Sequence, residues 1–132
     1  MDQKRKILVV DDEPDVIEYL TSLLEDNGYE VRTALNGKVA MELVKDDKPD
    51  LICLDISMPE ETGVRMLRNL HDDDRTKDIP VIIVSGVDPK FKDFISHRKQ
   101  VNPPSAYFEK PIDKHEFLNA IRTILSGIGI AQ

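Results

Sequence analysis

The sequence predicts an α/β protein: a doubly wound, five-stranded parallel sheet with helices on both faces, in three layers. Short, continuous apolar runs recur along the chain, and such runs suit strands buried on both faces, as in a parallel sheet. Between them, apolar residues recur at helical spacing, and strands that alternate with helices imply right-handed crossovers. The 132 residues favour one domain, residues 1–132, with a core from about residue 6 to residue 125.

The first half of the chain predicts two strand–helix units. Residues 7–10 are the first buried-strand run, and Pro14 lies in the first turn of the helix that follows. Gly28 is the expected left-handed cap of that helix. Residues 29–33 predict a short strand, and Asn36-Gly37 predicts the turn into a helix of about ten residues.

The second half predicts three more units. Buried-strand runs cover residues 51–54 and 79–84, and a short strand covers residues 106–108. A third helix follows Gly63. A fourth is expected after Asp88-Pro89, from an apolar stripe at Phe91, Phe94 and Ile95. The last helix is amphipathic, and Asp113 with Glu116 resembles a capping box at its start.

Composition excludes several classes of function. The net charge of −7 argues against direct nucleic-acid binding, because phosphate contacts need clustered Lys and Arg. No apolar run could span a bilayer and no signal-peptide pattern is present, so we expect a cytoplasmic protein without membrane contact. Cys53 lies inside an apolar run and is predicted to be a buried, inert thiol, which fits a reducing compartment. The three histidines share no metal-ligand spacing.

Polar residues stand at four of the predicted strand ends. They are Asp11 with Asp12, then Asp55, Ser85 and Lys110. Each alone has an ordinary explanation, such as helix capping, a turn or a surface cation. Because parallel strands share one carboxyl edge, where open α/β sheets bind their ligands, the four together predict a functional site.

The chemistry of this edge favours phosphoryl transfer. Asp11, Asp12 and Asp55 would place three negative charges in one crevice, which raises their pKa values or recruits a cation. Oxygen ligands with room for water suit Mg²⁺. A metal ion and Lys110 together would neutralise the carboxylates, so that Asp55 could attack an incoming phosphoryl group.

Two motifs complete the pattern. They are Asp55-x-x-Met58-Pro59-x-x-x-Gly63 and Tyr107-x-x-Lys110-Pro111. With the acid pair and Ser85, they resemble the receiver domains of two-component response regulators, over about residues 6–125. The resemblance, rather than periodicity, implies a flavodoxin-like fold with five helices and strand order 2-1-3-4-5.

The resemblance also implies roles for site residues. Asp55 would be the phosphoacceptor, and Lys110 would contact a phosphoryl oxygen, with a cis bond to Pro111. Mg²⁺, with Mn²⁺ as an alternative, would be the only cofactor. Asp12 and Asp55 would bind the ion directly, Asp11 through water, and Ser57 through its backbone carbonyl.

A switch and its partners follow from the same resemblance. The Ser85 hydroxyl would donate to the phosphoryl group, and Tyr107 would move into the space that this opens. A sensor histidine kinase or a histidine phosphotransfer protein would be the donor. A downstream effector protein or a fused output domain would read the face formed by residues 89–99, 106–109 and 113–125. We expect a monomer or a phosphorylation-dependent dimer.

Other functions remain open at this point. The loop at residues 102–105 stands where many receivers have a Gly-Ala pair, so the partners of the output face are not determined by the resemblance. A phosphate-independent interaction module of the same fold would be expected to lack a key residue. A Mg²⁺-dependent phosphatase with an Asp nucleophile would need an acid where Ser57 stands. Flavin binding is a third alternative on fold grounds only, because the acidic crevice would repel a flavin phosphate unless a metal ion intervened.

Overall fold

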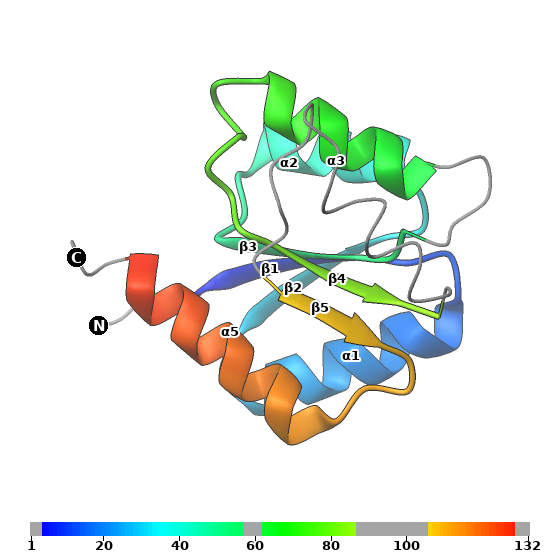
Figure 1. Cartoon of the computed structure of the whole chain (residues 1–132), viewed down its shortest axis with the longest axis vertical. Coiled ribbons are helices and arrows are strands. Elements are labelled where there is room, and N and C mark those ends of the chain that lie inside the picture. The colour runs from blue at the N-terminus through cyan, green and yellow to red at the C-terminus, as the bar shows by residue number, and fades with distance from the viewer. Residues whose placement is uncertain (1–3, 57–61, 87–105, 129–132) are drawn as a thin grey trace.

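The computed structural model describes residues 4–56, 62–86 and 106–128, and the described strands form one parallel sheet (Figure 1). The strand order is β2-β1-β3-β4-β5, which confirms the expected order 2-1-3-4-5. Because β1 and β3 are neighbouring parallel strands, their carboxyl ends lie side by side. The strands are β1 (Lys6–Val10), β2 (Glu30–Ala34), β3 (Leu51–Leu54), β4 (Val81–Ser85) and β5 (Ala106–Glu109).

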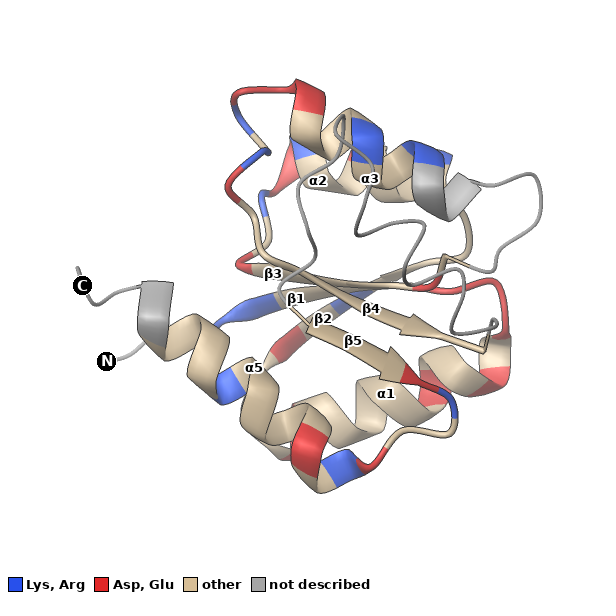
Figure 2. Ribbon diagram, viewed as in Figure 1, with Lys and Arg blue, Asp and Glu red and all other residues tan. Residues whose placement is uncertain are grey.

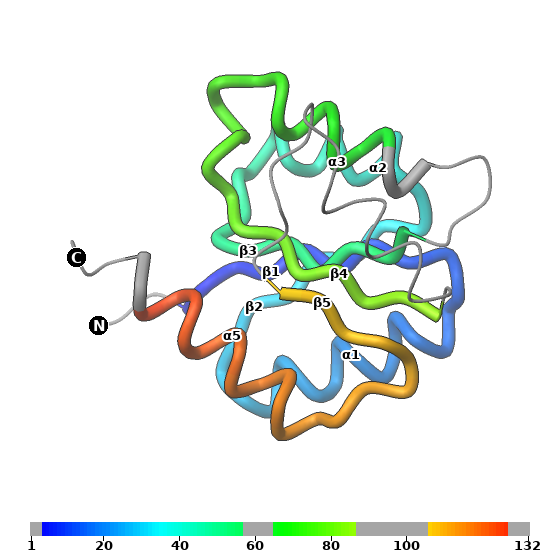
Figure 3. Tube along the Cα trace, in the orientation of Figure 1, coloured from blue at the N-terminus to red at the C-terminus, as the bar shows by residue number. Residues whose placement is uncertain are grey.

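Helices cover both faces of this sheet, which confirms the three-layer prediction. Helices α1 (Pro14–Asp26) and α5 (Lys114–Ile128) lie on one face. Helices α2 (Gly37–Asp46) and α3 (Thr62–Asp72) lie on the other. The trace in Figure 3 passes from strand to helix and back through the described part of the chain. The expected fourth helix lies outside the described residues.

Each strand contributes side chains to two separate cores, one per face. In β1, Ile7 and Val9 pack in the core under α1 and α5, whereas Leu8 and Val10 pack in the core under α2 and α3. Side chains of a strand alternate between faces, so a strand buried on both sides must be apolar at every position. This double burial explains why the three inner strands, β1, β3 and β4, appear in the sequence as continuous apolar runs.

The left-handed cap expected at Gly28 is present, the Asn36 side chain caps the next helix, and the cap expected at Asp88 lies outside the described residues. Gly28 has φ of +90°, and the bonds from its N–H to Glu25 O and from Tyr29 N–H to Leu24 O form a Schellman motif. The Asn36 side chain accepts from Val39 N–H at 2.9 Å and begins α2.

Asp113 is also a cap: one carboxylate oxygen accepts from His115 N–H at 3.0 Å and Glu116 N–H at 3.2 Å. Two strands start later than predicted: β2 begins at Glu30 rather than at residue 29. β4 begins at Val81 rather than Ile79, because Pro80 has no N–H to donate to the ladder.

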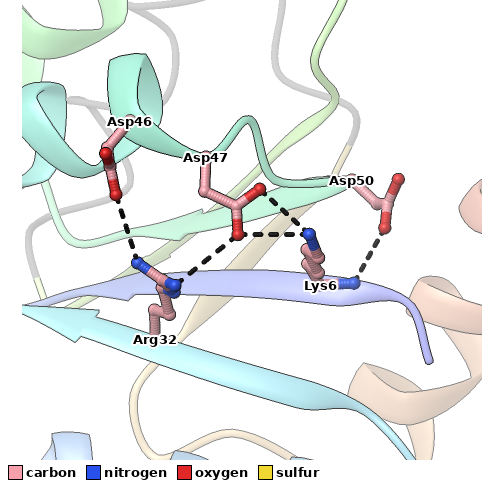
Figure 4. A network of polar contacts seen from close by, with 5 residues as sticks. All are labelled: Lys6, Arg32, Asp46, Asp47 and Asp50. Carbon is pink, nitrogen blue, oxygen red and sulfur yellow. Dashed lines mark hydrogen bonds and ion pairs between the residues drawn. The ribbon is translucent and has the colours of Figure 1, made fainter. Parts of the chain in front are cut away.

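Ion pairs connect β1 and β2 to the end of α2, on the side of the sheet away from the carboxyl ends of the strands. Figure 4 shows Lys6 and Arg32 converging on Asp47, with Lys6 Nζ 2.9 Å from an Asp47 oxygen. The hydrogen bond to Lys6 lowers the pKa of Asp47, and the same contact raises the pKa of Lys6. Lys6 N–H also donates to the Asp50 carboxylate at 2.8 Å, which ties the start of β1 to the turn before β3.

Burial makes Cys53 a probe of unfolding. The side chain is 1% exposed in β3, and burial raises the pKa of its thiol to about 12. The nucleophilic thiolate is therefore scarce at pH 8. We expect no alkylation by iodoacetamide in native buffer and complete alkylation in concentrated urea, measured by intact mass. Rapid alkylation of the native protein would show that β3 is accessible.

In the ranges that the structure describes, each helix is too short or too polar to cross a membrane.

Candidate functional site

Three polar residues continue the strand ladder one position beyond a strand end. The backbone N–H of each of these residues donates to a carbonyl of the neighbouring strand, which fixes the position of the Cα atom that carries the side chain. The N···O distances are 3.1 Å from Asp11 to Ala34, 2.9 Å from Asp55 to Val10 and 2.9 Å from Lys110 to Ser85. The sheet itself therefore aims all three side chains at one edge.

The Lys110 ammonium lies among three carboxylates. Its Nζ is 2.9 Å from Asp11 Oδ2, 2.9 Å from Glu13 Oε1 and 3.4 Å from Asp55 Oδ2. Asp11 and Asp55 are each 1% exposed, whereas the Lys110 side chain is 19% exposed. The ammonium thus links two buried carboxylates that come from different strands.

Four carboxylates converge at this edge. One oxygen each from Asp11, Asp12, Glu13 and Asp55 lies within 4.8 Å of the others. In Figure 2, the acidic stretch between β1 and α1 lies at the same edge as the basic position after β5. Carboxylate oxygens are the ligands that Mg²⁺ and other hard cations prefer. Because Asp12 and Glu13 are exposed while Asp11 and Asp55 are buried, the set is open to solvent on one side, which suits an ion that keeps water ligands.

The surroundings shift two pKa values at the site. Burial raises the pKa of Asp11 to about 6, although hydrogen bonds from Glu13 N–H and from Lys110 oppose the rise. Burial also lowers the pKa of Lys110, but the contacts with Asp11, Glu13 and Asp55 outweigh it, so the net shift is upward. Lys110 therefore stays charged at neutral pH, while ionised Asp11 is costly unless a cation is near.

Ser85 and Tyr107 lie on the neighbouring strands β4 and β5. Ser85 is the last residue of β4 and is fully buried, and its carbonyl accepts from Lys110 N–H. Tyr107 is partly buried in β5. Burial raises the pKa of Tyr107, as does the charge of Glu109, whereas interaction with the Ser85 side chain lowers it. The two predicted switch residues therefore interact across the β4–β5 pair.

The structure brings most of the predicted site residues together, and the Lys110–Pro111 bond is cis, as expected. Asp11, Asp12, Asp55 and Lys110 meet directly, and Ser85 joins them through the backbone. Ser57, Met58, Pro59 and the loop 102–105 lie outside the described residues, as do residues 89–99 of the expected output face. The contact of Glu13 with Lys110 was not predicted. Its only sequence signal was a third consecutive acid, one more than helix capping explains.

Comparisons with known proteins agree with this geometry. The family model of the response regulator receiver domain matches residues 7–122. PilH of Pseudomonas aeruginosa is 36% identical over 122 residues, covering 92% of this chain and 98% of PilH. The polar-differentiation response regulator DivK of Brucella anthropi is 32% identical over 121 residues, covering 92% of this chain and 96% of DivK.

A solved structure shows the same fold. It is the signal receiver domain of a signal transduction histidine kinase from Syntrophus aciditrophicus, with 29% identity and a TM-score of 0.83. The match covers 97% of this chain and 95% of that one. Because the family model spans most of the sequence and the relatives align along nearly their whole length, the chain belongs to the response regulator receiver domains of two-component signalling.

Proposed function

We propose that this receiver domain accepts a phosphoryl group on Asp55, with a divalent cation bound beside it, and so switches the binding of a partner protein. One observation carries the proposal: the Lys110 ammonium lies between the buried carboxylates of Asp11 and Asp55 where four acids converge. A phosphoryl group is anionic, so its transfer depends on positioning and on neutralising its oxygens.

The residues of this edge fit Mg²⁺, or Mn²⁺ in its place. Asp12 and Asp55 would hold the ion directly, Asp11 through water, and Ser57 through its carbonyl, although Ser57 lies outside the described residues. When bound, the ion supplies positive charge for the phosphoryl oxygens. Its charge would also lower the pKa of Asp11, which burial raises.

The chain's own residues would carry the reaction. An Asp55 carboxylate oxygen forms the new bond to phosphorus, while the bond from phosphorus to the donor breaks and its electron pair leaves with the donor. Lys110 keeps its proton and contacts a phosphoryl oxygen, because its pKa is raised. The product is an aspartyl phosphate with Lys110 beside it.

The switch would pass through Ser85 and Tyr107. Once Ser85 donates a hydrogen bond to the phosphoryl group, its interaction with Tyr107 would change. Tyr107 would then move inward and change the face formed by residues 89–99, 106–109 and 113–125. The burial of Ser85 at the end of β4 supports this coupling, because a buried hydroxyl needs a partner in either state.

The wider role follows from the family. We propose a single receiver domain over residues 1–132, with a core over about 6–125, acting in the cytoplasm as a monomer or a phosphorylation-dependent dimer. The donor is a sensor histidine kinase or a histidine phosphotransfer protein, and the reader is an effector protein or a fused output domain. The net charge of −7 disfavours direct binding to nucleic acid.

Incubation with acetyl phosphate tests the proposal. We expect one added phosphoryl group in the intact mass when Mg²⁺ is present and none when a chelator removes it, because uncancelled carboxylates repel the donor. Steady hydrolysis of varied phosphoesters would instead indicate a phosphatase. No modification and no Mg²⁺ binding would indicate a phosphate-independent interaction module and contradict the proposal.

A further inference from the structure

Glu13 occupies the N-cap position of α1, but its carboxylate does not cap the helix. Its backbone is extended, and its carbonyl accepts from Val16 N–H and Ile17 N–H at 3.1 Å each. Within the described chain, its side chain makes no capping hydrogen bond. The ordinary explanation for an acid at this position therefore does not account for the carboxylate.

The Glu13 carboxylate instead reaches Lys110, 97 residues away in the sequence. Its Oε1 lies 2.9 Å from Nζ, as close as Asp11 Oδ2 and closer than Asp55 Oδ2 at 3.4 Å. An ammonium has three N–H donors, and three carboxylates here take all of them. A phosphoryl oxygen on Asp55 can bind Lys110 only by displacing one of these contacts or sharing a donor.

Exposure decides which contact gives way. The Glu13 side chain is 61% exposed, whereas Asp11 and Asp55 are buried. An exposed carboxylate regains water when it lets go, but a buried one would be left uncompensated. Glu13 is therefore the contact that can exchange, and while it holds Lys110 it competes with the phosphoryl group for the ammonium.

We propose that Glu13 is a positioning residue that restrains Lys110 and thereby slows phosphoryl uptake by Asp55. The inference rests on the proposed function and adds to it a regulatory element on the same site. Glu13 forms no bond with the reacting atoms and acts through Lys110. Its carboxylate sets how often the ammonium is free to meet the incoming group.

The test is Glu13→Gln, which keeps the shape of the side chain and removes its charge. The control is Glu25→Gln, the same change on α1 about 18 Å further along the helix, where the side chain has no ion pair within the described ranges. With Mg²⁺ saturating, the maximal rate of uptake from acetyl phosphate should rise about 2- to 5-fold in Glu13→Gln, the range for an exposed ion pair. Glu25→Gln should match the wild type.

Saturation kinetics separate this effect from general charge repulsion. Loss of a distant negative charge would lower only the acetyl phosphate concentration that gives half-maximal rate. Release of Lys110 raises the maximal rate itself, because the donor is already bound when Lys110 acts. A maximal rate for Glu13→Gln equal to or below that of Glu25→Gln overturns the proposal.

A second readout does not depend on phosphorylation. Urea unfolding of Glu13→Gln, Lys110→Met and the double variant measures the coupling between the two side chains in a double-mutant cycle. We expect Glu13→Gln to be less stabilising, or more destabilising, in the wild-type background than in the Lys110→Met background, because only the wild type loses an ion pair, whereas both backgrounds lose a repulsive charge. Absence of coupling overturns the restraint even if uptake occurs. Absence of uptake by the wild type overturns the proposed function and the restraint with it.

Discussion

Asp55→Asn is expected to abolish phosphoryl uptake and to stabilise the metal-free protein. Asn keeps the size of Asp but has no anionic oxygen to attack phosphorus. With acetyl phosphate and Mg²⁺, the intact mass of the variant should stay unchanged while the wild type gains one phosphoryl group.

The gain in stability follows from crowding of like charges. Asp55 is one of four carboxylates that approach within 4.8 Å, and one ammonium offsets them. The Asp55–Lys110 contact is the longest of the three that this ammonium makes, at 3.4 Å. Relief of repulsion should therefore exceed the lost attraction, by about 1 kcal/mol, which raises the melting temperature by about 3–5 °C.

In the presence of Mg²⁺, the order of the two melting temperatures should change. Mg²⁺ should raise the melting temperature of the wild type, because a ligand that binds only the folded state stabilises it. Asp55→Asn should lose most of that shift. Asp26→Asn, an exposed residue of α1, is the matched control and should keep both uptake and the shift. Uptake by Asp55→Asn at the wild-type rate would place the acceptor elsewhere.

The arrangement of the site could be predicted because parallel strands share an edge. Asp11, Asp55 and Lys110 each follow a strand, so the topology brings them together whatever their distance in the sequence. The strands themselves were predicted from burial on both faces, which leaves unbroken apolar runs such as Leu51–Leu54. Order along the sheet came from the family resemblance, because periodicity does not say which strands are neighbours.

What could not be predicted depends on side-chain conformation. Glu13 could have capped α1, and nothing in its neighbours shows that it turns to Lys110 instead. The pairing of Lys6 with Asp47 could not be predicted from the sequence either, because nothing marks these two charged residues as partners before β1 and α2 pack together. Such contacts between residues distant in sequence are set by tertiary structure rather than by local pattern.

Lys110→Met is expected to lower uptake by about 100-fold, the usual cost of removing one group that stabilises developing negative charge. Met keeps the apolar stem of the side chain and loses the ammonium that contacts Asp11 and Asp55. The metal-free variant should also lose about 2–4 kcal/mol of stability at pH 7, because two buried carboxylates lose their countercharge. Lys114→Met, an exposed lysine at the start of α5, is the control and should change neither quantity.

The stability loss of Lys110→Met should depend on pH in a defined direction. In the folded protein the pKa of Asp11 is about 6, above the 3.8 of an unperturbed Asp, and Lys110 acts to lower it. A raised carboxyl pKa contributes stability that is present below about pH 4 and lost as the pH rises through 6. Removing Lys110 raises that pKa further, so the deficit relative to the wild type should be largest at pH 7 and shrink toward pH 4. Urea unfolding in a chelator at both pH values measures it. A deficit of equal size at pH 4 and pH 7 would mean that Lys110 stabilises the fold by packing, and that its charge does not hold the acidic edge together.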